Sequence, residues 1–347
     1  MSEKRRFEHK MLKEIHEQPV ALRRTLDQTR DEIEHIAKKN ARKIKMIYFT
    51  GSGTSYHACI AANYLVSRVT DYPSSTLPAS EFSAWTGKTG HHSRAWLIAI
   101  SQSGESRDVI DAARSAKLSN IQVLAITNDA QSRLAKLADF SVASQAGKEE
   151  AITATKSFTA TLLATYEFVT ALAKNERLNA ELDRLPSLVE ETLQHCETQC
   201  RDIASELCDR EFLFLLGSGA NYASALEGAL KLKESCNIYA EGFATREFLH
   251  GPMQLVDQRT PVFILQYELT DELLELTDRF KRLGAPTIIV GSDTAARGSG
   301  AIEIPAGLND VFQPMSYVIP LQLFAYYSSI SRGLNPDQPT KLKKVVE

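Results

Sequence analysis

The chain has 347 residues, of which 43% are hydrophobic and 24% charged, and its formal net charge is −3. This length exceeds one ordinary hydrophobic core and predicts about two domains of a globular protein. The balanced charge argues against nucleic-acid binding. The absence of a long apolar run argues against a membrane helix or a secretory signal. We therefore expect a cytoplasmic protein that binds neither nucleic acid nor a membrane.

Residues 1–40 are expected to be helical because they are rich in Glu, Lys, Arg and Leu, with Pro19 ending or kinking the first helix. Strands and helices then alternate, which predicts a parallel sheet covered by helices on both faces. The expected strands are residues 44–49, 96–100, 123–127 and 140–143, and the expected helices are residues 58–69, 108–118, 134–138 and 156–174.

Pro186 and the polar, helical stretch 187–210 are interpreted as a connector, after which the alternation restarts. The strands expected there are residues 212–216, 261–266, 286–290 and 301–304, and the helices are residues 270–283 and 316–330. We therefore predict an α/β protein with two tandem doubly wound parallel-sheet domains. The predicted segments are an N-terminal helical segment (1–40), a first domain (41–190), a second domain (191–333) and a C-terminal tail (334–347).

The two halves resemble each other. Residues 48–53 (YFTGSG) align with residues 214–219 (FLLGSG), and an alanine-rich helix follows each. A repeat of this length indicates duplicated domains. The halves differ after their second strand, where the first has SQSGES (101–106) and the second has Gln266-Tyr267-Glu268. We therefore predict that a ligand bound through this loop, such as a phosphate, is bound in the first half only.

Two hydroxyl-rich loops in the first half are candidates for phosphate binding. GSGTSY (51–56) and SQSGES each follow a strand and open a helix, where the partial positive charge of the helix N-terminus favours a phosphate dianion. Neither loop has the Walker or GxGxxG pattern, which argues against nucleoside triphosphates and dinucleotides. Each loop alone is more simply a helix cap, but the two together favour phosphate binding.

Residues 225–252 hold the candidate catalytic groups. Glu227, Lys231 and Glu234 stand at i, i+4 and i+7 of a predicted helix and so share one face. His250 follows in Leu-His-Gly-Pro. A carboxylate, a lysine and a histidine brought together could move protons along a sugar backbone. The spacing alone favours the simpler alternative of a solvated stripe of ion pairs.

The five cysteines are odd in number and fall in predicted helices, so we expect no disulfide framework. Cys196 and Cys200 lie one helical turn apart beside His195, which could form part of a metal site. A zinc site needs three or four ligands at recognisable spacing. Buried helix cysteines are the favoured interpretation, with neither metal nor cofactor.

The sequence resembles the double sugar-isomerase (SIS) domain family, most closely the isomerase half of glutamine–fructose-6-phosphate aminotransferase and the SIS-type glucosamine-6-phosphate deaminases. Seven motifs in order along the chain carry the resemblance. They are KEIHEQP (13–19), GSGTSY, SQSGES, ATKSF (154–158), ALKLKE (229–234), EFLHGP (247–252) and NPDQPTKLKKV (335–345). The resemblance implies flavodoxin-like SIS domains that bind hexose or hexosamine 6-phosphates.

The resemblance also implies a role for each matching residue. Glu234 would move the proton between C1 and C2 with Lys231 beside it, and His250 would open the sugar ring from the neighbouring subunit of a homodimer. The tail lysine that closes over the ligand would be Lys344, with the adjacent Lys343 as the alternative. The residues implied in phosphate binding are Ser52, Gly53, Thr54, Ser55, Ser101, Gln102, Ser103 and Ser106.

One departure from the family bears on the reaction. The aminotransferase carries a glutaminase domain whose nucleophile is the cysteine after the initiator methionine, whereas residue 2 here is Ser2 and no cysteine precedes Cys59. We therefore expect the chain to handle free ammonia or none. The expected reaction is conversion of glucosamine 6-phosphate to fructose 6-phosphate with ammonia release. The alternatives are an ammonia-dependent synthase or isomerase subunit, another deglycase or ketose isomerase, and a non-catalytic hexose-phosphate sensor.

Overall fold

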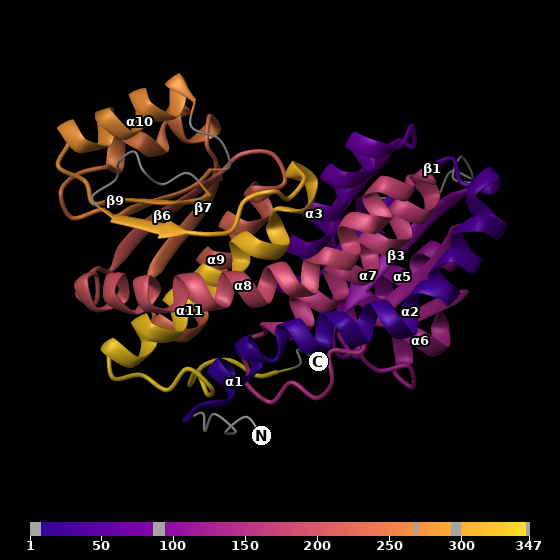
Figure 1. Ribbon diagram of the computed structural model, residues 1–347. Helices are drawn as coiled ribbons and strands as arrows, with labels where there is room; N and C mark the ends of the chain where they lie inside the picture. Colours follow the sequence, from indigo (N-terminus) through magenta and orange to yellow (C-terminus); the bar gives the residue numbers. More distant parts are fainter. Residues whose placement is uncertain (1–7, 86–93, 267–269, 293–299, 345–347) are drawn as a thin grey trace.

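Two parallel five-stranded sheets form the computed structural model of the protein, which describes residues 8–85, 94–266, 270–292 and 300–344. The strand orders are β2-β1-β3-β4-β5 and β7-β6-β8-β9-β10, so both sheets have the flavodoxin-like order and the predicted fold class is confirmed. The sheets lie in opposite halves of the molecule, and helices pack between them (Figure 1).

Eight strands were predicted, and all eight are present with ends shifted by at most two residues. The strands of the first sheet are β1 (Met46–Gly51), β2 (Ser74–Pro78), β3 (Ala95–Ser101), β4 (Gln122–Thr127) and β5 (Phe140–Ala143). Those of the second are β6 (Phe212–Gly217), β7 (Tyr239–Ala244), β8 (Val262–Leu265), β9 (Thr287–Gly291) and β10 (Gly300–Glu303).

The strands β2 and β7, which lie at the edges of the two sheets, were not predicted from the sequence. Every residue of β2 is half-buried, so its sequence SSTLP shows no apolar alternation. In β7, Gly242 lies so close to α9 (Asn221–Cys236) that a Cβ atom there would stand 2.6 Å from the carbonyl carbon of Ala225. This glycine lets the helix pack directly on the strand.

The helices cover both faces of each sheet. In the first half they are α1 (Lys10–His16), α2 (Gln18–Asn40), α3 (Thr54–Val69), α4 (Ala79–Trp85), α5 (Arg107–Leu118), α6 (Arg133–Leu137) and α7 (Lys156–Ala173). The later ones are α8 (Glu176–Glu206), α9, α10 (Asp271–Arg282) and α11 (Pro314–Ser331). Short 3₁₀ helices are η1 (Ala41–Lys43), η2 (Glu247–His250), η3 (Pro252–Leu255) and η4 (Asp310–Phe312). The first helix, α1, ends at His16 just before Pro19, as predicted, and Pro19 lies in the first turn of α2. No helix within these described ranges is long and apolar enough to cross a membrane.

The helical stretch expected after Pro186 is present, but it belongs to α8, a helix of 31 residues that begins at Glu176 and continues through the proline. An interior proline removes one backbone hydrogen bond and strains the preceding turn. Leu182, Leu185, Leu188 and Val189 flank it and are all buried, so packing of the apolar face offsets this cost. The start expected at Pro186 was therefore wrong, because tertiary packing overrode a local helix breaker.

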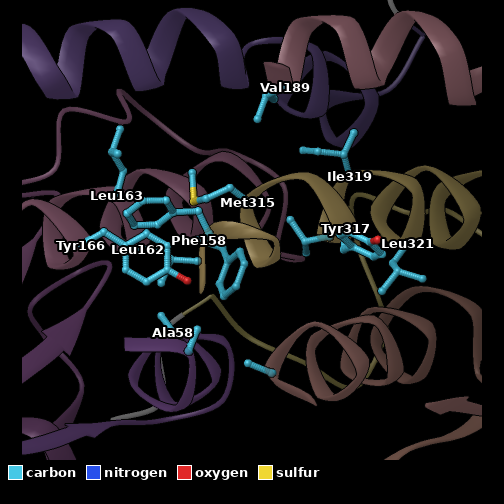
Figure 2. Close-up of a cluster of buried hydrophobic side chains, with 14 of the residues drawn as sticks. Ala58, Phe158, Leu162, Leu163, Tyr166, Val189, Met315, Tyr317, Ile319 and Leu321 are labelled. Atoms are coloured by element: carbon cyan, nitrogen blue, oxygen red, sulfur yellow. The ribbon is translucent and has the colours of Figure 1, made fainter. Parts of the chain in front are cut away.

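One hydrophobic cluster runs through both halves. It includes Phe49 of β1 and Leu215 of β6, and its centre is the layer of helices between the sheets. Figure 2 shows Phe158 of α7 and Met315 of α11 lying close together, with Val189 of α8 above them. Burying this much shared apolar surface ties the two halves to each other.

Glu167 of α7 is a buried carboxyl group in the contact between α7 and α2. Thr29 Oγ1 donates to its Oε2 at 2.6 Å, and Arg30 Nε lies 3.5 Å from its Oε1. Burial raises the pKa of Glu167 to about 7, against the opposing effects of Thr29 and Arg30. The native state therefore binds a proton that the unfolded state has lost between about pH 4.5 and 7.

We expect Glu167→Gln to remove this pH dependence, because glutamine resembles the protonated acid at every pH. Relative to the wild type, the variant should gain up to about 3 kcal/mol of unfolding free energy between pH 5 and pH 8. Urea unfolding at the two pH values measures the difference. Glu206→Gln, an exposed carboxylate at the end of α8, is the control. Parallel profiles for the wild type and Glu167→Gln would contradict the expectation.

Candidate active site

The helix α9 carries a buried cluster of charges. The side chains of Glu227 and Lys231 are fully buried, whereas that of Glu234 is 21% exposed. Lys231 Nζ lies 3.2 Å from Glu227 Oε1 and 2.7 Å from Glu234 Oε2. The alternative of a solvated stripe of ion pairs is therefore wrong. Instead, Lys231 is buried between two carboxylates, of which Glu227 is also buried and Glu234 is in contact with solvent.

Two residues of α3 complete this cluster from the first half of the chain. Thr54 Oγ1 donates to Glu227 Oε1 at 3.0 Å and accepts from Lys231 Nζ at 3.1 Å. His57 Nδ1 lies 2.7 Å from Glu227 Oε2. The GSGTSY loop thus touches the helix that carries Glu234. His57 was not predicted from the sequence, although its position one turn after Thr54 puts both residues on one helix face.

The charges of this cluster stabilise one another. Burial alone would raise the pKa of Glu227, but Lys231 and His57 outweigh it and hold that pKa below its usual range. Burial alone would lower the pKa of Lys231, but Glu227 and Glu234 raise it above its usual range. Lys231 is consequently a fixed ammonium at neutral pH and cannot accept a proton. Glu234 is the partly exposed carboxylate of the cluster.

The SQSGES loop connects β3 to α5 in a tight turn. Gly104 has φ +65°, and a Cβ atom there would stand 2.1 Å from Ser132 Oγ, so only glycine fits. The Gly104 N–H donates to Ser101 Oγ and the Glu105 N–H donates to Ser103 Oγ, both at 3.1 Å. The Ser101 hydroxyl also donates to Ser106 Oγ at 3.5 Å, whereas the Ser103 hydroxyl has no acceptor among the described residues, so its O–H remains available to donate to a phosphate.

The two hydroxyl loops lie at the same edge of the first sheet. β1 and β3 are parallel neighbours, with Thr50 opposite Ala99, and each loop leaves the carboxyl end of its strand. This is also where the strand order reverses, the usual ligand position in such sheets. Within the first loop, Gly53 has φ +54° and its carbonyl accepts from Tyr56 and His57. Ser52 is exposed and Ser55 half-buried in the same turn.

Gln102 and Ser106 are the other predicted phosphate-binding residues of the SQSGES loop. The Gln102 carbonyl accepts from the Asn128 N–H at 3.0 Å, so the backbone at Gln102 also links the loop to the end of β4. Ser106 Oγ lies 3.5 Å from Ser101 Oγ. Among the described residues, no hydrogen bond joins this loop to Glu227, Lys231 or Glu234.

His250 ends η2 and is exposed. Gly251, which follows it, has φ +147° and leads directly into η3 at Pro252. In the described part of the chain, His250 makes no hydrogen bond and no ion pair. The structure of one chain therefore does not bring His250 to the cluster of α9.

The C-terminal tail is anchored through Lys344. Its Nζ donates to Glu149 Oε2 at 2.9 Å and to the Ala151 carbonyl at 2.6 Å. The Glu149 carboxylate is fully buried and also accepts from Ser157 Oγ at 2.6 Å and from the Thr155 N–H at 2.9 Å. Burial would raise the pKa of Glu149, but Lys344 and Ser157 together hold it below its usual range. The sequence analysis missed Glu149, whose partners Thr155 and Ser157 belong to the ATKSF motif.

The cysteines lie inside the fold. Cys59, Cys196, Cys200 and Cys236 are buried and Cys208 is half-buried, which confirms their predicted burial. The Cys200 thiol donates to the Pro320 carbonyl at 3.4 Å. Over the described ranges, no group of three or more His, Cys, Asp or Glu residues could hold a metal ion.

Comparison with known proteins identifies the family. The model of the SIS domain matches residues 41–171 and 206–332. The chain belongs to the SIS domain family. A glutamine–fructose-6-phosphate aminotransferase of Methanothermobacter thermautotrophicus is 36% identical over the whole of this SIS chain, which spans 58% of the length of that relative.

Solved structures of SIS proteins agree in fold. The C-terminal domain of glucosamine-fructose-6-phosphate aminotransferase from Francisella tularensis is 31% identical, with a TM-score of 0.89, 97% of this chain covered and 100% of that one. A glucosamine-6-phosphate deaminase from Thermotoga maritima is 28% identical, with a TM-score of 0.76, 97% of this chain covered and 99% of that one. The resemblance inferred from the motifs is confirmed.

Proposed function

We propose that this SIS protein converts glucosamine 6-phosphate to fructose 6-phosphate and ammonia. The observation that supports this most is the pairing of the partly exposed Glu234 carboxylate with the buried Lys231 ammonium, on a helix that touches the GSGTSY loop. An aldose–ketose conversion needs a base over C1 and C2 and a positive charge near the oxygen that becomes negative. This cluster offers both, next to a loop suited to phosphate.

In the proposed mechanism, the serine loops bind the phosphate and His250 of a second copy of the chain opens the sugar ring. Glu234 removes the C2 proton and returns it to C1, and the Lys231 ammonium stabilises the enediolate-like charge. The product is the C2 imine of the ketose. Water adds to this imine, the C–N bond breaks, and ammonia and fructose 6-phosphate leave. Lys344 would hold the tail over the sugar.

The same site run in reverse would make glucosamine 6-phosphate from fructose 6-phosphate and free ammonia. This second candidate is favoured by the 36% identity, over the whole chain, to a glutamine–fructose-6-phosphate aminotransferase. Both directions use the same residues. Substrate and ammonia concentrations, rather than side chains, decide between them.

The proposal is tested by measuring ammonia release from glucosamine 6-phosphate, galactosamine 6-phosphate and mannosamine 6-phosphate. Each sugar is assayed with and without added glutamine, and the reverse reaction is assayed with fructose 6-phosphate and ammonium chloride. Release of ammonia with fructose 6-phosphate as product supports the proposed direction. Turnover only in the reverse assay would favour the synthase, and no turnover of any sugar would contradict both.

We expect Ser101→Ala combined with Ser103→Ala to raise KM for the sugar phosphate and to change kcat little. Each charge-assisted hydrogen bond lost to the phosphate costs about 1.5–3 kcal/mol. Steady-state kinetics measure the effect, and Ser205→Ala, which changes an exposed serine of α8, is the control. Unchanged KM in the double variant, with raised KM after changes at Gln266, would move the phosphate site to the second half.

We expect truncation before Lys341 to leave a folded protein that has lost most of its turnover. The tail is held through the contact of Lys344 with the buried Glu149, so its removal uncovers that carboxylate without opening the core clusters. Circular dichroism and steady-state kinetics measure folding and turnover. Lys341→Met is the matched control, because it changes an exposed lysine of the same tail that makes no hydrogen bond or ion pair with the described residues. Full activity of the truncated chain would show that the tail is dispensable.

A further inference from the structure

A cavity of about 640 Å³ opens at the carboxyl edge of the second sheet. It is bordered by the turn between β6 and α9, by the last turns of α3, and by the segment that includes η4 and leads into α11. This is the position in the second half that corresponds to the phosphate loop of the first. The volume is in the range of pockets that hold small metabolites.

The cavity is lined by both positive and negative charges. The N-terminus of α9, a helix of 16 residues, lies at the cavity and carries a partial positive charge. Arg68 of α3 and Asp310 of η4 also border it, and neither makes an ion pair or side-chain hydrogen bond with any other described residue. Gly219 adds open backbone, because nothing lies within 4 Å of where its Cβ atom would stand.

A buried amide at the cavity lacks a partner. Gln313 is 5% exposed, and its Oε1 accepts from Asn221 Nδ2 at 2.8 Å. This bond orients the amide and leaves Gln313 Nε2 buried with no acceptor in the described structure. An unsatisfied buried donor is unfavourable, and a ligand oxygen in the cavity would satisfy it.

We propose that this cavity is a second ligand site, which binds a phosphate monoester of a small polyhydroxylated metabolite. The phosphate would lie between the Arg68 guanidinium, the N-terminus of α9 and the Gln313 amide. The Asp310 carboxylate would accept hydrogen bonds from the hydroxyl groups. The site is separate from the serine loops of the first half, and the inference does not depend on the proposed reaction.

The cavity is connected to the charge cluster by two shared helices. α3 contributes Arg68 at one end and Thr54 at the other, and α9 contributes Asn221 near the cavity and Glu227 in the cluster. These contacts make α3 and α9 antiparallel neighbours. A ligand that bridges them at the cavity would hold the two helices together along the same interface that positions Glu227 and Lys231.

The test uses isothermal titration of the full chain with inorganic phosphate and, separately, with glucose 6-phosphate. The wild type should bind two equivalents of glucose 6-phosphate per chain, and the variant with Ser101→Ala and Ser103→Ala should retain one strong site. In that background, Arg68→Gln should weaken both probes by about ten- to hundredfold, the loss expected for a charge-assisted hydrogen bond. Arg177→Gln, an exposed arginine of α8, is the control and should change nothing.

Two further variants separate the parts of the proposal. Gln313→Leu should weaken both probes, whereas Asp310→Asn should weaken glucose 6-phosphate and not inorganic phosphate. The proposal is overturned if the variant with Ser101→Ala and Ser103→Ala binds neither probe. It is also overturned if adding Arg68→Gln to that variant leaves the affinity for both probes unchanged. Equal effects of Asp310→Asn on the two probes would overturn the assignment of a polyhydroxylated ligand.

Discussion

Replacing Glu234 with glutamine is expected to lower kcat by about 10²–10⁴-fold, the usual contribution of a general base. Glutamine keeps the volume of the side chain and can still accept from Lys231 Nζ, which lies 2.7 Å from the present carboxylate. The serine loops are untouched, so binding of the sugar phosphate should persist. Steady-state kinetics and a direct binding measurement separate the two quantities.

Solvent exchange gives this prediction a second readout. In deuterated water the wild type should exchange the C1 or C2 hydrogen of the sugar phosphate, and Glu234→Gln should not. Glu206→Gln changes an exposed carboxylate of α8 and should leave both rates unaltered. Exchange at the wild-type rate in Glu234→Gln would show that another group is the base.

Replacing Lys231 with methionine is expected to reduce the free energy of unfolding by about 3–5 kcal/mol, because it leaves a buried carboxylate without its cation. Lys231 and Glu227 are both fully buried, so water cannot screen the remaining charge. With the cation gone, burial should raise the pKa of Glu227, and the loss should shrink as the pH falls and that group becomes protonated. Urea unfolding at pH 5 and pH 8 measures both effects.

Two comparisons isolate the buried pair. The double variant Glu227→Gln with Lys231→Met should recover part of the lost stability, since it removes both charges. Lys38→Met breaks an exposed pair with Glu34 at the same helical spacing, where the lysine side chain is 73% exposed, and should cost less than about 1 kcal/mol. Similar losses for Lys231→Met and Lys38→Met would contradict the role of burial.

The amino-acid sequence by itself determined the alternation of strands and helices, the duplication and the two loops. These features are local: a buried strand such as β3 (AWLIAIS) is apolar throughout, and a turn into a helix needs glycine and hydroxyl groups. The shared helix face of Glu227, Lys231 and Glu234 is likewise a matter of spacing. The spacing does not determine whether that face is buried, because the same spacing also suits a solvated helix.

Only the tertiary structure decided what surrounds these residues. Thr54 and His57 are about 170 residues from Glu227 in the sequence, and they meet it because α3 of one half packs against α9 of the other. Lys344 reaches Glu149 over a separation of 195 residues. Such contacts follow from how two sets of apolar surfaces fit together, which no short stretch of sequence encodes. The same packing keeps α8 helical through Pro186 and buries the charges on which the proposed chemistry depends.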